Sequence, residues 1–557
     1  MSSIKIIALG GVRENGKSLY AVEVEEDIFV LDCGLVYPED ELLGIDVVIP
    51  DFSYLEENKE RIAGVFLTHG HADAVGALPY FLQNIDAPVF GSKLTIALAK
   101  YYVESSKLVK GFNDYHEVTE NTEIDFASAT IKFFKTTHTI PDSLAIVIKT
   151  SEGNIVYTGD FKFDQSASVE YQTNFGRITD VGEDYVLALL SDSSDAESPV
   201  ENVSDRKIAE AMLETFLNAQ GRIVVACVAS NILRIQQVIN AAYESGRKIF
   251  LTGSELEEIV NIALSLNKLT VPDKELIISF NQMKKLPDNE LVILETGNAG
   301  EPIKALQKMA LGRHRQVNLH EGDLVYIATT PSVAMETQIA RTKDLIYRAD
   351  AEVFEMANSK KASGHATPND LKLMINLLQP TFFIPIQGEY RSLLAHAELA
   401  NELGIPYKNI FIPGKGDVVE IENGQMNASG QVAAGNVLVD GIGVGDIGNI
   451  VLKDRKILSE DGVFVAVVTI SRRLGKILSG PQIISRGFVY MKTSEGLLTE
   501  AQKIVTEVVE ENLASEDFEW PRLKQEVRDA LSRYLFDKTK RRPVILPMIM
   551  EASNYKK

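Results

Sequence analysis

The sequence predicts an α/β protein built from several domains. In the first 200 residues, short apolar strands end in polar loops that carry histidines and aspartates. From residue 205 onward, short apolar strands alternate with helical segments, which is typical of a parallel sheet with crossover helices. A chain of 557 residues is long enough for about three or four domains of ordinary size.

The most informative stretch is 65–80. Val65 to Leu67 form an apolar run that suits a buried strand, and His69 and His71 follow directly. Because these histidines are two residues apart, both rings point to the same side of an extended backbone. Asp73 adds an oxygen donor beside them. Nitrogen and carboxylate donors on one loop suit zinc or manganese. Unrelated loop residues are the alternative, but His-Gly-His-X-Asp rarely leaves a strand by accident.

Two later strands end in the same way. The predicted strand 126–134 is followed by His138, and an apolar strand from Asn154 ends in Thr-Gly-Asp160. Three strand ends that bring candidate ligands to one sheet edge are more specific than any one motif. Asp32 ends a hairpin, where it could be an ordinary turn residue.

Composition limits the class of protein. Apolar residues make up 45% and charged residues 24%, as in ordinary globular proteins. Two cysteines exclude a disulfide scaffold, and the sequence shows no signal peptide and no apolar run of membrane-spanning length, so we expect a cytoplasmic protein without a membrane. The net charge of −22 argues against non-specific coating of nucleic acid.

Charge is distributed unevenly along the chain. Residues 451–557 contain 19 Lys and Arg against 15 Asp and Glu, and residues 1–450 contain 37 against 63. A basic tail indicates either a polyanionic partner or a solvated surface, and composition does not decide between them. The role of the turn Gly297 to Gly300 is likewise not decided by the sequence. It could bind a phosphate through its backbone N–H groups, or simply join a strand to a helix.

Together, the motifs resemble the ribonuclease J family, in the β-CASP branch of the metallo-β-lactamase superfamily. The resemblance covers essentially the whole chain. It rests on Gly-Gly-X-X-Glu-X-Gly (10–16), Asp-Cys-Gly (32–34), the histidine loop, His-X-Ile-Pro-Asp-Ser (138–143), Thr-Gly-Asp-Phe-Lys-Phe-Asp (158–164), Ser-Asp-Ser (191–193), Ser-Gly-His (363–365) and Gly-Glu-Tyr-Arg (388–391).

The resemblance implies a fold and a division into domains. The fold is a metallo-β-lactamase αββα sandwich with an inserted β-CASP α/β domain and a small α+β C-terminal domain. The expected segments are the metallo-β-lactamase domain (1–204 and 351–424), the β-CASP domain (205–350), a Gly- and Asn-rich linker (425–450) and the C-terminal domain (451–557).

The resemblance also implies roles for individual residues. Metal ligands are implied at His69, His71, Asp73, His138 and Asp160, with Asp160 bridging two ions. Catalytic residues are implied at Asp73, Asp192 and His365, and a substrate-phosphate loop at Lys361, Ala362, Ser363, Gly364 and His365.

The second metal site departs from the family pattern. Ala74 and Gln387 stand where the family has histidines, so only Asp73 and Asp160 remain of four protein ligands. Two ions about 3.5–4 Å apart stabilise both the attacking and the leaving oxygen, whereas a methyl group donates nothing and an amide oxygen is a weak ligand. We therefore expect one ion of zinc or manganese per subunit rather than two, and reduced activity. Within the family, this pattern resembles the second of two paralogues.

The resemblance implies a ribonuclease with 5′-to-3′ exonuclease activity, and endonuclease activity as a second mode, in rRNA maturation and mRNA decay. The implied partners are RNA, preferably 5′-monophosphorylated, a second copy in a homodimer, a ribonuclease J paralogue in a hetero-oligomer, and an RNA degradosome. The alternative is a non-catalytic RNA-binding or scaffolding subunit for an active paralogue. A small-molecule hydrolase is disfavoured, because in this family the inserted domain narrows the site into a channel.

Overall fold

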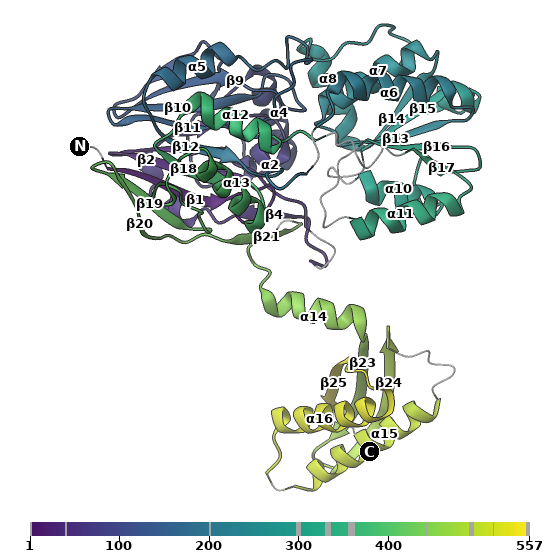
Figure 1. The fold of residues 1–557 in the computed structure, drawn as a ribbon. Helices are drawn as coiled ribbons and strands as arrows, with labels where there is room; N and C mark the ends of the chain where they lie inside the picture. Colours follow the sequence, from purple (N-terminus) through teal and green to yellow (C-terminus); the bar gives the residue numbers. More distant parts are fainter. Residues whose placement is uncertain are drawn as a thin grey trace. The chain divides into compact units, whose positions relative to one another are not determined.

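The computed structural model describes most of the chain, and it divides into two compact units. The large unit holds residues 1–37 and 47–437, and the small unit holds residues 38–46 and 438–557. Each is described by itself (Figure 1). The described residues are 3–38, 42–199, 202–296, 302–328, 336–354, 363–441, 443–488, 495–515 and 517–552.

Two mixed sheets form a sandwich in the large unit. The first has the order β20 (Gln425–Gln431), β19 (Asp417–Glu422), β1 (Ile4–Gly10), β2 (Leu19–Val24), β3 (Asp27–Leu31), β5 (Ile62–Phe66), β6 (Val89–Gly91) and β7 (Tyr115–Glu117). The second has the order β18 (Phe382–Ile386), β12 (Val186–Asp192), β11 (Gly153–Tyr157), β10 (Leu144–Thr150), β9 (Thr130–Lys135) and β8 (Glu123–Asp125).

The core of the sandwich lies between the two sheets. Side chains that alternate along β1 and β3, such as Ile6 and Phe29, pack against Ile146 and Leu190 of the second sheet. Helices cover the outer faces: α3 (Leu78–Phe81) and α4 (Lys93–Ser106) lie by the first sheet, and α5 (Phe175–Glu183), α12 (Pro368–Leu378) and α13 (Tyr390–Glu402) pack on the second. The predicted αββα layering is confirmed.

The expected linker at 425–450 is wrong over its first half. Residues Gln425–Gln431 form β20, which pairs antiparallel with β19 at the edge of the first sheet. Residues Asn436–Asp440 form β21 and Gly443–Val444 form β22. Because β20 is an exposed edge strand, its sequence QMNASGQ carries no apolar alternation and looks like a loop.

The inserted domain is a parallel α/β sheet. Its strand order is β14 (Lys248–Thr252), β15 (Leu291–Glu295), β13 (Ile223–Ala226), β16 (Leu324–Ile327) and β17 (Glu352–Phe354). Helices α6 (Asp205–Asn218), α7 (Ile232–Glu244) and α8 (Ser254–Ser265) cover one face, and α10 (Pro302–Ala310) and α11 (Glu336–Arg348) cover the other. Covered on both faces, the central strands read as continuous apolar runs such as IVVA.

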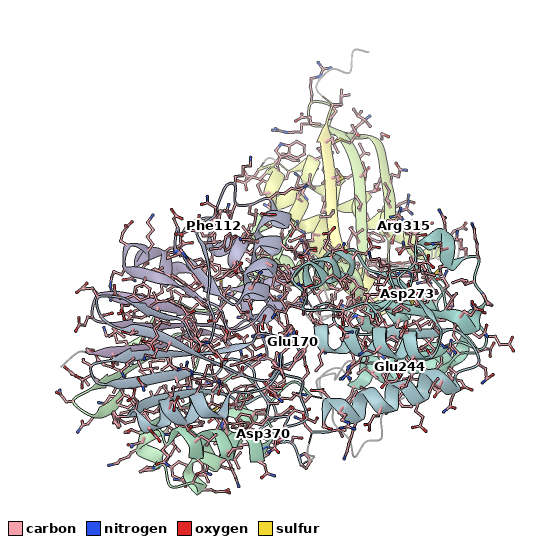
Figure 2. All side chains as sticks on the ribbon, turned by 90° about the horizontal axis from the view of Figure 1, so that it is seen from above. Phe112, Glu170, Glu244, Asp273, Arg315 and Asp370 are labelled. Carbon is pink, nitrogen blue, oxygen red and sulfur yellow. The ribbon has the colours of Figure 1, made fainter. Side chains whose placement is uncertain are left out.

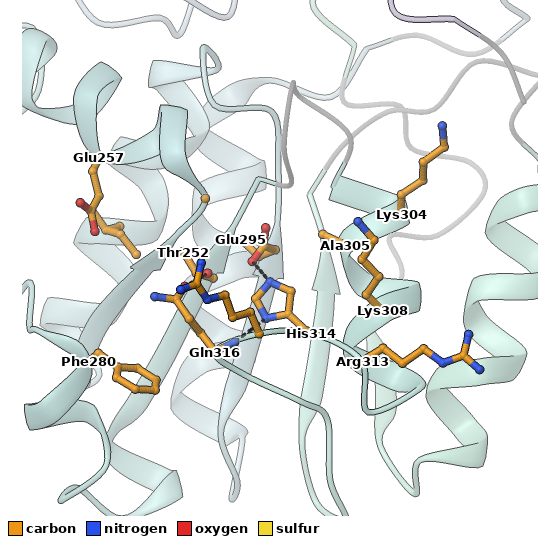
Figure 3. A pocket seen from close by; sticks show the side chains of 13 residues that line it. Thr252, Glu257, Phe280, Glu295, Lys304, Ala305, Lys308, Arg313, His314 and Gln316 are labelled. Atoms are coloured by element: carbon orange, nitrogen blue, oxygen red, sulfur yellow. Dashed lines mark hydrogen bonds and ion pairs between the residues drawn. The ribbon is translucent and has the colours of Figure 1, made fainter. Parts of the chain in front are cut away.

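The parallel strands place all their carboxyl ends at one edge of this sheet. A pocket opens there beside β14 and β15 (Figure 3).

Acidic side chains such as Glu170 and Glu244 project from the surface of the large unit, in keeping with the excess of acidic residues in 1–450 (Figure 2). The turn Gly297 to Gly300 lies outside the described residues.

The small unit has its own core. Its sheet has the order β24 (Lys476–Arg486), β23 (Val463–Ser471) and β25 (Val544–Glu551). Helices α15 (Glu495–Ala514) and α16 (Trp520–Thr539) bury one side-chain row each against it, and α14 (Asn449–Glu460) precedes β23.

The second strand of this sheet, β24, ends at Arg486, and residues 487 and 488 form a bend. Gly480 and Pro481 sit inside β24 where its register against β23 shifts. No helix in the described part of the chain is long and apolar enough to cross a membrane.

Candidate metal centre

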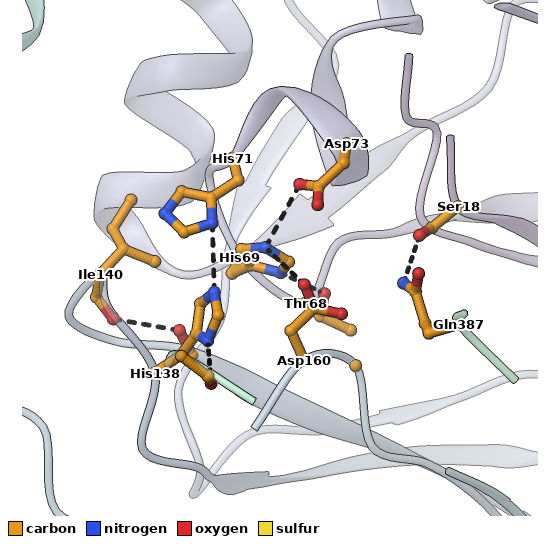
Figure 4. Close-up of polar contacts among 12 residues, drawn as sticks. Ser18, Thr68, His69, His71, Asp73, His138, Ile140, Asp160 and Gln387 are labelled. Atoms are coloured by element: carbon orange, nitrogen blue, oxygen red, sulfur yellow. Dashed lines mark hydrogen bonds and ion pairs between the residues drawn. The ribbon is translucent and has the colours of Figure 1, made fainter. Parts of the chain in front are cut away.

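Strand ends of both sheets meet at one edge of the sandwich. His69 and His71 follow β5 of the first sheet, whereas His138 follows β9 and Asp160 follows β11 of the second. Figure 4 shows the three imidazoles turned toward one another, with the Asp73 and Asp160 carboxylates beside them. The structure thus brings together all five ligands predicted from the sequence.

The three imidazoles form a tight group. Their ring centroids are 4.8 Å, 4.9 Å and 4.8 Å apart. Nδ1 of His138 lies 2.9 Å from the carbonyl oxygen of Gly364, which can only accept, so this nitrogen carries the proton. The lone pair of His138 is therefore on Nε2, which lies 3.1 Å from Nδ1 of His71. A carbonyl that fixes the tautomer in this way is the usual support of a metal-binding histidine.

The three imidazoles differ in their pKa values. Burial lowers the pKa of His71 to about 3 and that of His138 well below its ordinary value, so both are neutral at pH 7. Burial alone would also lower the pKa of His69, but the nearby carboxylates of Asp73, Asp160 and Asp32 raise it to about 9. The carboxylates thus stabilise a positive charge at the point where a metal ion would supply one.

The buried polar atoms fit a cation. His69 Nε2 lies 3.6 Å from Asp73 Oδ1 and 3.8 Å from Asp160 Oδ2, both beyond hydrogen-bond length. Within the described part of the chain, His69 Nε2, Asp73 Oδ1 and Asp160 Oδ1 are buried without a hydrogen-bond partner. Unsatisfied buried atoms are costly, and a cation bound to His69 and Asp160 beside Asp73 would offset that cost. The residues therefore fit a first metal ion.

The second metal site lacks donors. Ala74 is fully buried and offers only a methyl group. Gln387 is also buried, and its Nε2 donates to the hydroxyl of Ser18. Of the four positions predicted for this site, only Asp73 and Asp160 are charged donors. Asp160 also belongs to a further group of possible donors, with Asp192 and His365.

A second polar pair lies beside the imidazoles. His365 Nδ1 donates to Asp192 Oδ2 over 2.8 Å, and Asp192 Oδ1 accepts from the backbone and hydroxyl of Ser194. Burial opposes a charged imidazole, but Asp192 outweighs it and raises the pKa of His365 to about 10. The His365 ring centroid is 5.8 Å from that of His138. A cationic imidazole therefore stands next to the cluster.

The predicted phosphate loop is described in part. Ser363, Gly364 and His365 lie at the site, whereas Lys361 and Ala362 lie outside the described residues. The Gly364 carbonyl accepts from His138, and a Cβ at Gly364 would come within 2.9 Å of the His138 ring. Only glycine allows this approach.

Sequence reasoning missed the network that supports His69. Thr68 donates its backbone N–H to Asp32 over 2.8 Å, and Tyr157 donates its hydroxyl to Asp32 over 2.7 Å. The Thr68 hydroxyl lies 2.9 Å from both Asp32 Oδ2 and His69 Nδ1. If it donates to Asp32, His69 Nδ1 must donate to it, which leaves His69 Nε2 free for a metal ion. Asp32 thus holds the residue before His69 through hydrogen bonds to Thr68, and no motif pointed to Tyr157.

His396 is a further residue whose place the sequence did not reveal. It is completely buried. Its Nδ1 lies 2.9 Å from the hydroxyl of Ser193, next to Asp192. It therefore helps to support the loop that holds Asp192.

Family models match four segments of the chain. They are the metallo-beta-lactamase superfamily (13–193), the ribonuclease J beta-CASP domain (220–346), the Zn-dependent metallo-hydrolase RNA specificity domain (355–413) and the ribonuclease J C-terminal domain (450–552). Ribonuclease J 2 of Streptococcus pyogenes serotype M3 is 51% identical over 551 residues, which cover 99% of this chain and 100% of that one. The chain belongs to the ribonuclease J family.

Further comparisons agree with this membership. Ribonuclease J 2 of Staphylococcus epidermidis and of Staphylococcus aureus are each 47% identical over 550 residues, which cover 98% of both chains. A solved structure of a protein of unknown function from Enterococcus faecalis matches with a TM-score of 0.52 and 16% identity, over 75% of this chain and 100% of that one. That likeness concerns the fold alone. The predicted family and fold class of this ribonuclease J member are confirmed.

Proposed function

We propose that this chain is a metal-dependent ribonuclease with one complete metal site and an impaired second one. The observation that supports this is the group of His69, His71 and His138 with unsatisfied carboxylate oxygens beside it. Bound by these imidazoles and Asp160, a zinc or manganese ion would lower the pKa of a water molecule and polarise a phosphoryl oxygen.

The chain's own residues bind and orient the phosphodiester. His365, kept cationic by Asp192, donates its free Nε2–H to an oxygen of the scissile phosphate and offsets the charge that develops there. Asp73 accepts a hydrogen bond from the attacking water. Ser363 and Gly364 belong to the loop that positions the phosphate, together with Lys361 and Ala362.

We further propose 5′-to-3′ exonuclease activity, with endonuclease activity as a second mode, on RNA that is preferably 5′-monophosphorylated. The relatives named Ribonuclease J 2 support the ribonuclease activity on which this proposal builds. The proposed setting is rRNA maturation and mRNA decay in the cytoplasm. The chain would act as a homodimer and in a hetero-oligomer with a ribonuclease J paralogue, within an RNA degradosome.

The proposed domain division keeps 1–204 with 351–424 as the metallo-β-lactamase domain, 205–350 as the β-CASP domain and 451–557 as the C-terminal domain. The first domain is extended by β20, which completes its sheet. Family models over 220–346 and 450–552 support the other two domains.

A second candidate function is a non-catalytic scaffold for an active paralogue. Ala74 and Gln387 favour it, because both remove a donor from the second site. A scaffold, however, gains nothing from the buried His69 and its unsatisfied carboxylate neighbours, which lower stability unless a metal binds.

One assay separates the two functions. The purified chain is incubated with 5′-monophosphorylated RNA and either zinc or manganese, beside His69→Ala. His116→Ala serves as the control, because His116 is exposed and pairs with Asp114 away from the site. Cleavage by the wild type and by His116→Ala, with loss in His69→Ala, supports the ribonuclease. Equal cleavage by all three would leave only the scaffold.

A further inference from the structure

The β14–β15 pocket is a hollow of about 880 Å³ in the inserted domain. It is lined by the carboxyl ends of β14 and β15, by α10 and by the loop that follows α10 (Figure 3). Ligands of open α/β sheets bind at this end of the strands. The volume is near the upper end of the usual range for small-molecule sites, so it exceeds what a single phosphate ion needs.

The lining is positively charged. Among the described residues that line the pocket, Lys304, Lys308, Arg313 and Arg315 lie with two carboxylates, those of Glu257 and Glu295. This excess stands out because residues 1–450 contain 37 Lys and Arg against 63 Asp and Glu. No ion pair neutralises Lys308, Arg313 or Arg315 within the described ranges of the chain. The pocket therefore suits a ligand that carries several negative charges.

The remaining lining adds groups that a nucleoside can use. Glu295 is only 1% exposed, and His314 Nε2 lies 3.6 Å from its Oε2. Thr252 donates its hydroxyl to the side-chain oxygen of Gln316. Phe280 also lines the pocket, and the Lys284 ammonium lies 4.1 Å from the centroid of its ring. Bases stack on such rings, and hydroxyl groups bond to buried carboxylates and imidazoles.

The sheet that carries the pocket is linked to the metal centre through α7. β15 pairs directly with β13, and Ala226 at the end of β13 lies opposite Glu295. Helix α7, which follows β13, begins beside the centre, because its Leu233 donates its backbone N–H to the carbonyl of Thr139, the neighbour of His138. With strands about 4.8 Å apart, the ends of β15 and β14 lie about 5 and 10 Å from the end of β13 along the sheet edge.

We propose that the β14–β15 pocket binds a ribonucleotide through its phosphate groups and base, as a site separate from the metal centre. Lys308 and Arg315 contact the phosphates, Phe280 stacks on the base, and the Glu295–His314 pair bonds to hydroxyl groups. The identification of the ligand as ribonucleotide rests on the proposed function. The ligand is either a segment of the RNA chain or a free nucleotide, and both present the same chemistry.

The test compares the variant Lys308→Ala/Arg315→Ala with Lys207→Ala/Arg341→Ala. Both pairs remove one lysine and one arginine from exposed positions of the inserted domain, and only the first pair lines the pocket. Binding of a fluorescent single-stranded 20-mer RNA is measured by anisotropy in EDTA, so cleavage plays no part. A salt series and a titration with 5′-AMP complete the measurement.

The expected result is a weaker and less salt-sensitive interaction for the pocket variant. The loss of two phosphate contacts lowers the slope of log affinity against log salt by about 1.4. At 0.1 M salt, this corresponds to an RNA affinity that is about 25-fold weaker. If the pocket variant loses RNA binding and keeps 5′-AMP binding, the site binds the RNA chain. If the pocket variant loses 5′-AMP binding, the site binds a free nucleotide. If both double variants bind RNA and 5′-AMP alike, the inference is overturned, whatever the cleavage assay shows.

Discussion

Tyr157→Phe tests whether the buried bond between Tyr157 and Asp32 supports the metal centre. The Tyr157 hydroxyl donates to Asp32 Oδ2 over 2.7 Å, and both side chains are at most 1% exposed. Burial raises the pKa of Asp32 to about 6, and this hydrogen bond acts in the opposite direction. The substitution removes one donor from a buried carboxyl group and leaves the ring in place.

The expected loss of stability is about 2 kcal/mol. A hydrogen bond to a charged group contributes about 1.5–3 kcal/mol, and the Thr68 N–H and hydroxyl still satisfy Asp32 in part. Because Asp32 holds Thr68 and Thr68 contacts His69, metal affinity should also fall, by about tenfold, as for other groups that support a ligand.

Urea denaturation and zinc titration measure the two effects, and Tyr185→Phe is the matched control. Tyr185 is 58% exposed, and its hydroxyl accepts from Thr381 at the surface. The loss of the Tyr185 hydroxyl should change the free energy of unfolding by less than about 0.5 kcal/mol. If both variants shift stability and zinc affinity equally, the Tyr157–Asp32 bond does not support the centre.

Three further outcomes are expected. His138→Ala should lower bound zinc from about one ion per chain toward none, as measured by elemental analysis, and unchanged zinc content would exclude His138 as a ligand. Ala74→His with Gln387→His should raise bound metal toward two ions and increase RNA cleavage; an unchanged count would show that the second site lacks more than these donors. Burial lowers the pKa of His396 to about 3, so the unfolded chain binds a proton below about pH 6.5 that the folded chain does not. Stability should therefore fall from pH 6.5 toward pH 3, by about 2 kcal/mol at pH 5, and His396→Gln should lack this part of the pH dependence in thermal melts.

The parts of the site that sequence predicts are those that lie directly at strand ends. His69 and Asp160 follow apolar runs of buried strands, and a short polar segment after such a run has little freedom in where it points. The Tyr157–Asp32 bond joins residues 125 positions apart, and neither residue carries a local signal of the other. Only the packing of the two sheets brings them together.

Exposure decides what sequence reveals about the fold. The central strands are buried on both faces and carry continuous apolar runs, so they are readily predicted. The edge strand β20 is exposed along almost its whole length, and selection for an apolar face is absent there. The β14–β15 pocket is harder still, because its lining comes from strand ends, a helix and a loop whose residues have no common pattern.

The physical state of the centre bears on whether this chain catalyses or only supports a paralogue. His69 and Asp160 are almost fully buried, and burying charged groups lowers stability unless partners compensate. The chain nevertheless keeps hydrogen bonds that orient three of the four imidazoles at the centre: Thr68 with His69, Gly364 with His138 and Asp192 with His365. In a scaffold, apolar residues at these positions would be more stable, and the orienting bonds would have no purpose. Loss confined to Ala74 and Gln387, with the first site and its supports intact, therefore favours a slow nuclease over an inert subunit.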